Sequence, residues 1–363
     1  MSDDLLLSVA EKGAFMSTKA RILLTAIATA ASAWTGSALA ADLPVKAPEP
    51  AAAPTSFFLV NDNSVSFTWT PTANDPGVDF NNHPTFNKYI GEFTHFDAWA
   101  YGTNLFDLSY LQSDRNNPIF DQPGAAGAAE FFALWRSTLG LNQVTHSKMF
   151  SSVLFTNIEA EVGGNFNTEN DGVSPRLQAY VLGPKFDLNL PGNVAFAVLA
   201  YKEFNHNSYL GSASPIPSLD VPGFSGDREF KWTPRLELDV TEPLAFLPWP
   251  VSFINHTAVT FPKGTGISAE NLAAACLVGA SGGCAPGTNP AAAFTKTEVR
   301  TDSRLNLDAS KLWFNKKGVW DLYVGYRYWY NKFGTDHNAP LFSEIAPGTA
   351  IESTAYIGTS FHF

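Results

Sequence analysis

The stretch that decides the fold is the end of the chain, residues 353–363, which reads STAYIGTSFHF. Its side chains alternate between two faces. One face carries Ala355, Ile357, Thr359, Phe361 and Phe363, and the other carries Thr354, Ser360 and His362. A period of two indicates a β-strand, and the segment is about as long as a tilted strand that crosses a bilayer. The segment therefore predicts a membrane-crossing strand, with an edge strand of a soluble protein as the alternative.

The opposite end of the chain has the features of a secretory signal. After Met16 come Lys19 and Arg21, then the apolar residues 22–34, then the small-residue site at 38–40, ALA. This is the order of a signal peptide, and its apolar core is too short for a spanning helix. Acidic residues precede Met16, so we expect translation to start there. We predict that residues 1–40 are removed, that the Pro- and Ala-rich residues 41–60 form a periplasmic leader, and that 61–363 form the folded domain.

Composition narrows the class of protein. Aromatic residues make up 13% of the chain and charged residues 16%, where about a quarter is usual for charge. The mean hydropathy is -0.05, and no long apolar run follows the signal, which excludes a helical membrane protein. Aromatic richness without apolar runs favours a transmembrane β-barrel. A net charge of -11 argues against nucleic acid as a partner.

Alternation along the chain predicts about twelve strands, an even number as bacterial single-chain barrels require. The expected strands are 64–70, 88–96, 105–111, 130–138, 153–163, 176–182, 194–203, 232–240, 251–261, 298–308, 321–329 and 355–363. Tight links such as 188–193 and 315–318 alternate with long ones such as 205–231 and 262–297. The expected fold is therefore an all-β, antiparallel up-and-down barrel that spans a membrane, with short turns at one end and long loops at the other.

Strand parity assigns residues to the barrel lumen, because a charge facing lipid costs a few kcal/mol at mid-membrane. The expected charged lumen residues are Arg136, Glu159, Glu161, Arg176, Arg235, Glu237, Arg300, Asp302 and Arg304, and the expected aromatic ones are Phe96, Tyr180, Tyr323 and Trp329. About twelve strands should leave a narrow passage. The alternative interpretation is that these charges only neutralise one another.

Three further residues carry specific expectations. Cys276 and Cys284 lie in a Gly- and Ala-rich stretch, and in an oxidising compartment a local disulfide is the default. A terminal Phe363 resembles the closing residue of bacterial outer-membrane barrels, which implies that it acts as an assembly signal for the barrel-assembly machinery. The histidines are scattered singly, so we expect no metal and no cofactor.

Several motifs, in order along the chain, resemble one family. His95, Trp99, Tyr101 and Asn104 fall within residues 88–111, and the segments LGPKFD (182–187), YKEFNHN (201–207), PKG (262–264) and GYRYWYNKFG (325–334) follow. This set resembles the Tsx-like nucleoside-specific channel-forming outer-membrane proteins. The resemblance implies a twelve-stranded barrel in the bacterial outer membrane, in contact with lipid and lipopolysaccharide, that passes nucleosides or similar small polar solutes by diffusion.

Two other functions remain open at this stage. One is an outer-membrane hydrolase of the lipase type, for which Asn205-His206-Asn207-Ser208 is the local cluster of catalytic residue types. Neighbours on one strand point apart, however, so this run does not bring a nucleophile and its base together. The other is a structural barrel with a plugged lumen. We expect a channel and not an enzyme.

Overall fold

The computed structural model describes residues 57–78, 83–117, 126–171, 174–206, 225–268, 294–339 and 346–363. The expected signal peptide, most of the leader, and Cys276 and Cys284 lie outside these residues. The strands are β1 (Phe58–Ala73), β2 (Phe86–Trp99), β3 (Gly102–Ser113), β4 (Ala129–Gly140), β5 (Phe155–Glu169), β6 (Arg176–Leu188), β7 (Asn193–His206), β8 (Asp227–Glu229), β9 (Thr233–Pro243), β10 (Val251–Thr260), β11 (Glu298–Asp308), β12 (Trp320–Tyr330) and β13 (Ile351–His362). The first strand begins at Phe58, earlier than the alternation predicted.

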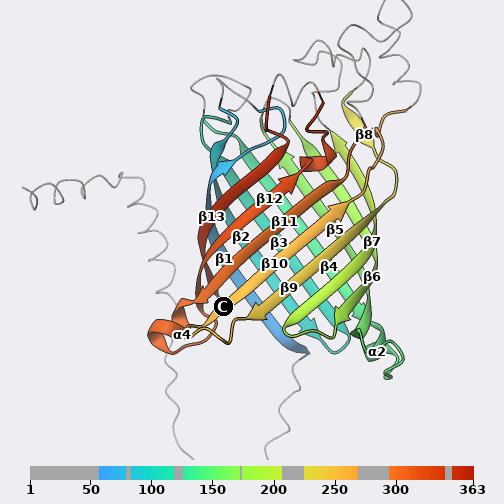
Figure 1. Cartoon of the computed structure of the whole chain (residues 1–363), viewed down its shortest axis with the longest axis vertical. Coiled ribbons are helices and arrows are strands. Elements are labelled where there is room, and N and C mark those ends of the chain that lie inside the picture. Colours follow the sequence, from blue (N-terminus) through green and yellow to red (C-terminus); the bar gives the residue numbers. More distant parts are fainter. Residues whose placement is uncertain are drawn as a thin grey trace, which may run out of the picture. The chain divides into compact units, whose positions relative to one another are not determined.

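The strands form a closed antiparallel barrel (Figure 1). Each long strand pairs with its neighbours in sequence, and β13 pairs with β1, with Trp69 opposite Ile357. The short β8, which the sequence did not predict, pairs only with the end of β7. The twelve remaining strands make the predicted up-and-down barrel. The described residues include no helix that is long and apolar enough to cross a membrane.

The connections differ between the two ends of the barrel. At one end, here the turn side, the strands are joined in sequence by residues 100–101, 141–154, 189–192, 244–250 and 309–319. At the other end, the loop side, they are joined by residues 74–85, 114–128, 170–175, 207–232, 261–297 and 331–350. The two turn-side helices are α2 (Leu141–Val144) and α4 (Ala309–Phe314). The predicted length asymmetry is therefore present, although 141–154 is longer than 170–175. The carboxyl terminus lies on the turn side (Figure 1).

The distribution of side chains is the reverse of that in a soluble protein. Mid-strand apolar residues such as Leu182, Val198 and Ile357 are 57%, 40% and 53% exposed, whereas Glu203 and Glu352 are 1% and 2% exposed. In soluble proteins a glutamate is almost never buried and a large apolar residue usually is. Apolar residues that face outward and charges that face inward are the arrangement of a barrel that spans a membrane.

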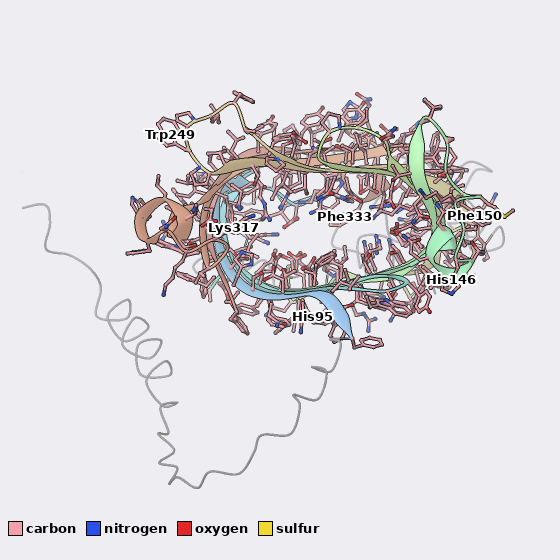
Figure 2. All side chains as sticks on the ribbon, turned by 90° about the horizontal axis from the view of Figure 1, so that it is seen from below. His95, His146, Phe150, Trp249, Lys317 and Phe333 are labelled. Atoms are coloured by element: carbon pink, nitrogen blue, oxygen red, sulfur yellow. The ribbon has the colours of Figure 1, made fainter. Side chains whose placement is uncertain are left out.

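Aromatic residues form outward belts near both ends of the strands. Ring pairs occur near the loop side at Tyr110–Phe131 and Phe166–Tyr180, and near the turn side at Trp320–Phe361 and Phe57–Trp99. Such belts mark the two membrane interfaces of transmembrane barrels. In the view along the barrel, Trp249 lies outside the ring of strands and Phe333 lies inside it (Figure 2).

The last residue closes the barrel on the turn side. The amide of Phe363 donates to the carbonyl of Asn63 at 2.8 Å, and the amide of Asn63 donates back at 3.3 Å. The Phe363 side chain is 74% exposed. Its ring therefore adds little burial within the barrel, and its role as an assembly signal stays a prediction.

Candidate functional site in the barrel interior

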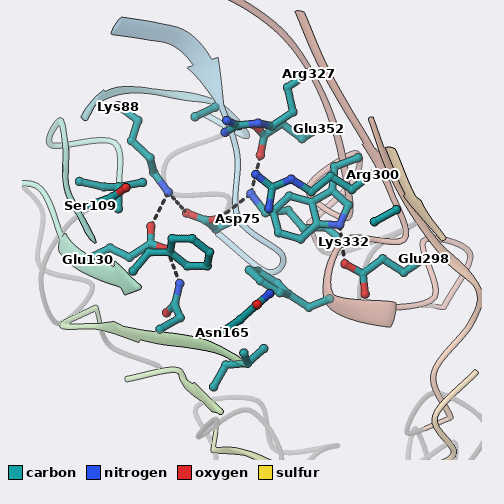
Figure 3. A pocket seen from close by; sticks show the side chains of 18 of the residues that line it. Asp75, Lys88, Ser109, Glu130, Asn165, Glu298, Arg300, Arg327, Lys332 and Glu352 are labelled. Atoms are coloured by element: carbon teal, nitrogen blue, oxygen red, sulfur yellow. Dashed lines mark hydrogen bonds and ion pairs between the residues drawn. The ribbon is translucent and has the colours of Figure 1, made fainter. Parts of the chain in front are cut away.

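A network of buried charges fills the loop side of the lumen, and we call its five residues the lysine cluster: Asp75, Lys88, Glu130, Lys332 and Glu352 (Figure 3). The Lys88 ammonium lies 3.1 Å from Asp75 and 3.0 Å from Glu130. The Lys332 ammonium lies 2.9 Å from Asp75 and 2.5 Å from Glu352. Each ammonium is thus held by two carboxylates, which offsets the high cost of burying a charge.

Asp75 lies between the two ammonium groups of the lysine cluster and outside the membrane-spanning strands. Burial opposes ionisation of this carboxyl, but the positive charges of Lys332 and Lys88 outweigh burial and hold the pKa of Asp75 below its ordinary value. Asp75 therefore stays ionised in the folded protein at neutral pH and links the loop after β1 to β2 and to the segment after β12.

A second group of charges crosses the lumen between strands that are not neighbours in the sheet. Arg136 on β4 reaches Glu237 on β9 at 3.3 Å and Glu161 on β5 at 3.3 Å. Arg235 shares the same Glu237 at 2.5 Å and donates to the hydroxyl of Thr260 at 2.8 Å. Because β5, β6 and β7 separate β4 from β9 along the wall, this bridge closes off part of the bore.

Arg327 forms an ion pair with Asp302, a carboxylate on β11. Its Nε lies 2.8 Å from Asp302, and its Nη1 lies 3.7 Å from Glu352. The hydroxyl of Tyr356 donates a second hydrogen bond to Asp302. Asp302 is thus engaged with β12 and β13, and it is not paired with the arginines two residues away on its own strand.

Arg300 and Arg304, which we call the arginine pair, have no such partners. The Nε atoms of both are buried without a hydrogen-bond partner, and neither side chain forms an ion pair with the described residues. Instead, the guanidinium of Arg300 lies 4.9 Å from the ring centre of Trp329, and that of Arg304 lies 5.0 Å from the ring centre of Tyr323. Buried hydrogen-bond donors without partners are rare in native proteins, so each such donor requires a physical explanation.

Two carboxylates on β2 and β3 also lack ion pairs with described residues. Glu92 accepts hydrogen bonds from Ser109 at 3.0 Å and Ser66 at 3.5 Å. Asp107 is the cross-strand neighbour of Thr94 and lies within electrostatic range of Arg304 and Glu92. The lumen therefore presents free acidic groups on one wall and the arginine pair on another.

A cavity of about 140 Å³ lies among these groups. Its lining includes Arg300, Trp329, Glu92 and members of the lysine cluster. Pockets that hold drug-sized ligands measure about 300–1,000 Å³. The space is thus narrow, and its polar groups can contact a small solute from several sides.

Most residues that parity assigned to the lumen face inward. They are Phe96, Arg136, Glu159, Glu161, Arg235, Glu237, Arg300, Asp302, Arg304, Tyr323 and Trp329. Phe96 is opposite Asp62, whose carboxylate contacts the inward ring of His362 at 2.9 Å.

The assignment is wrong for β6. Arg176 and Tyr180 point outward, and Tyr180 is 41% exposed in the loop-side aromatic belt. In the loop-side half of β6 the inward residues are apolar instead, and Ala179 and Val181 pack against Leu199 of β7. Further along the strand, Lys185 points inward and lies 3.6 Å from Asp239 of β9. Arg176 can face outward because it is the first residue of β6, at the loop-side end, where the cost of a charge outside the barrel falls toward zero.

Parity reasoning missed several charged lumen residues. Lys332 and Lys263 lie after the strands, in loop-side segments that turn back into the barrel, where they are 3% and 1% exposed. Lys263 is paired with Glu203 at 2.5 Å. Arg327 is on a predicted strand with inward parity and could have been found. Both lysines lie within the motifs of the sequence resemblance, at 262–264 and 325–334, and this is the signal that could have pointed to them.

Comparison with known proteins defines no family. No model of a known protein family matches the chain, and no curated protein matches its sequence. Similar solved structures include the translocator domain of the autotransporter NalP from Neisseria meningitidis, at 9% identity over 95% of each chain with a TM-score of 0.32. Others are OccK11 of Pseudomonas aeruginosa, at 9% identity over 84% of this chain and 95% of that chain with a TM-score of 0.30, and OmpF of Salmonella typhi, at 11% identity over 84% and 97% with a TM-score of 0.30. Values this low do not indicate a shared substrate.

Proposed function

We propose that the protein is an outer-membrane channel through which small polar solutes diffuse passively. The observation that supports this most is the combination of a closed barrel, an apolar outer wall and a narrow inner cavity with charges that lack partners. A purely structural barrel would be expected to pair its buried charges, as the lysine cluster does, because an unpaired buried charge is costly. The turn side would face the periplasm and the loop side the exterior, as in bacterial barrels.

Nucleosides are the permeants that the sequence resemblance suggests, and the chemistry of the lumen is compatible with them. The guanidinium groups of Arg300 and Arg304, which lie over the rings of Trp329 and Tyr323, are planar groups on which a base can stack, and Glu92 and Asp107 can accept hydrogen bonds from ribose hydroxyls. A channel must also release its solute, so several weak sites serve better than one tight site. In this proposal the solute moves past Trp329 and then Tyr323, and Glu92 on β2 and Asp107 on β3 border the same lumen.

The test is single-channel recording in planar bilayers. Purified protein should give discrete conductance steps, and adenosine and thymidine should reduce the ion current at millimolar concentration, while ribose alone should do so only weakly. Trp329→Leu should weaken the nucleoside block and leave the open conductance in place, because the variant removes the ring that holds Arg300 in position but no charge. Protein that inserts without conducting would contradict the channel, and conductance without nucleoside block would contradict only the permeant.

A hydrolase receives less support. His206 contacts the carboxylate of Asp227 on β8 at 2.8 Å, and the Ser225 hydroxyl also donates to Asp227 and does not contact His206. A nucleophile must lie within hydrogen-bond reach of its base. Asn207 and Ser208 lie outside the described residues. We therefore propose that the protein is not an enzyme, which an esterase assay on lipid and on short-chain esters would test.

A further inference from the structure

The arginine pair lies on one line along the lumen. Arg300 and Arg304 are four residues apart on β11, so they share a face and their Cα atoms are about 13 Å apart along the strand. The strand runs from the loop side to the turn side, and Arg300 is therefore the outer and Arg304 the inner of the two. A solute that enters from the loop side would meet them in this order.

Each arginine rests on an aromatic ring whose position is fixed by other contacts. The indole of Trp329 donates to Glu298 at 2.7 Å and packs against Phe333 with 4.8 Å between ring centres. The hydroxyl of Tyr323 forms a 2.7 Å hydrogen bond with Thr68. Stacking on a ring uses the face of a guanidinium and leaves its in-plane N–H donors free, so both arginines are held in place with donors to offer.

Gly358 leaves space for the ring of Tyr323, over which Arg304 lies. Gly358 is the cross-strand partner of Tyr323, and a Cβ at Gly358 would lie 2.4 Å from the tyrosine ring. The ring can therefore lie against the wall of the barrel, under Arg304. Tyr356 has the same relation to Gly325, and its hydroxyl bonds Asp302. The tyrosine–glycine pairs thus shape the wall on which the arginine pair is displayed.

The nearby carboxylates are engaged elsewhere. Asp302 is held by Arg327 and Tyr356, Glu352 by Lys332, and Glu298 accepts from Trp329. No described carboxylate lies within ion-pair distance of either member of the arginine pair. A guanidinium in this position matches a planar carboxylate or a phosphate, both of which it can bind through two parallel hydrogen bonds.

We propose that Arg300 and Arg304 are two successive binding steps for the anionic group, a carboxylate or a phosphate, of a small solute. This inference rests on the proposed channel function and names the class of solute. Each arginine lies over its own aromatic ring, so the lumen offers two similar anion sites in succession. The anionic group can transfer from the first site to the second, as conduction along several weak sites requires. Glu92 on β2 and Asp107 on β3 repel anions, which favours passage along the arginine side of the bore.

The experiment measures block of single-channel current by benzoate and by phenyl phosphate, with neutral benzamide as the matched solute. The two anions separate the carboxylate from the phosphate source of the same chemistry. In the wild-type protein, at least one of the anions should block at a concentration about tenfold lower than benzamide, which corresponds to about 1.4 kcal/mol. The Arg300→Gln/Arg304→Gln variant should lose this difference and keep an open conductance.

Two further variants separate binding from general electrostatics. Arg300→Lys/Arg304→Lys keeps both charges but removes the planar forks, so the reversal potential in a salt gradient should stay near the wild-type value while block by the anion weakens several-fold. Arg176→Gln removes a charge from the outer surface and should leave both readouts unchanged. A block that is insensitive to the double Gln variant, or equal for anions and benzamide, would overturn the anion path.

Calorimetry on the detergent-solubilised protein distinguishes the failure of this inference from the failure of the channel. Anion binding that is lost in the double Gln variant, in a protein that does not conduct, would support the arginine sites and refute the channel. Conductance without anion binding would refute the arginine sites and leave the channel. Circular dichroism of each variant, with a β-rich spectrum equal to that of the wild type, ensures that a loss reflects the site and not the fold.

Discussion

The lysine cluster and the arginine pair lie in the same lumen, and Arg300 lines the same cavity as the cluster, yet the two groups hold their positive charges in opposite ways. In the cluster, Lys88 and Lys332 each contact two carboxylates. In the pair, Arg300 and Arg304 contact rings and no carboxylate among the described residues. Charge inside a barrel is therefore of two kinds. One kind holds loops and strands together, and the other is available to a solute.

The largest effect on stability is expected when one ammonium group is removed from the lysine cluster. Lys332→Met leaves Asp75 and Glu352 buried with one cation fewer, and removing one partner of a buried ion pair costs about 3–5 kcal/mol. We expect a loss of this size in the free energy of unfolding, measured by urea titration in detergent micelles. Arg300→Met is the matched control and should lose far less. Equal losses in the two variants would contradict the distinction.

The cross-lumen bridge should behave like the cluster, with a smaller effect. Glu237→Gln keeps the shape of the side chain but removes the charge that Arg235 and Arg136 share. Hydrogen bonds to charged groups contribute about 1.5–3 kcal/mol each, so we expect a loss of that order in the same unfolding assay. The bore should also become more permeable to anions, because two guanidiniums lose their shared counter-charge. An unchanged reversal potential would argue against a bridge that borders the path.

Acid should weaken the cluster through Asp75. The folded pKa of Asp75 lies below its ordinary value of 3.8, so its ionised form contributes stability that is fully present above the unfolded pKa and is lost as the pH falls through the folded pKa. The free energy of unfolding should therefore decrease below about pH 4. Asp75→Asn should be less stable than the wild type at pH 7 and should show a shallower decrease in acid. Parallel pH profiles for the two proteins would contradict this assignment.

The smallest effect on stability is expected for the arginine pair. Arg304→Gln removes a cation stacked on Tyr323, an interaction worth about 0.5–1 kcal/mol at exposed sites and more when desolvated, and it also removes an unpaired charge from the lumen. These terms oppose each other, so the free energy of unfolding should change by less than about 1 kcal/mol. The reversal potential in a salt gradient should shift toward cation selectivity. A loss as large as that of Lys332→Met would show that Arg304 is structural.

The barrel itself could be predicted from the sequence because its signal is repeated many times. Period-two alternation recurs in every long strand, and the connections differ in length between the two ends. The short β8 could not be predicted, since Asp227–Glu229 has no alternation to detect. The faces of β6 were assigned wrongly because polar residues were assumed to point inward. The loop-side half of its inward face is apolar and packs on β7.

Only part of the candidate site could be predicted from the sequence. Strand parity places Arg300, Arg304, Tyr323 and Trp329 on the inner wall, but it cannot say which inward charges find partners. That depends on segments that leave the strands and fold back, as at Lys332 and Lys263, and on contacts across the bore, as between Arg136 and Glu237. These contacts join residues far apart in sequence, so no local sequence pattern predicts them.

The seam between β1 and β13 has a consequence for how the protein is made. It joins Asn63 to Phe363, residues separated by 300 positions, so the ring cannot close before β13 has been made. Until then two strand edges stay unpaired, and open edges are templates for aggregation. Contacts of such long sequence separation also slow folding. Any sheet that forms before β13 pairs with β1 therefore has two open edges, and a factor that shields these edges should raise the yield of the closed barrel.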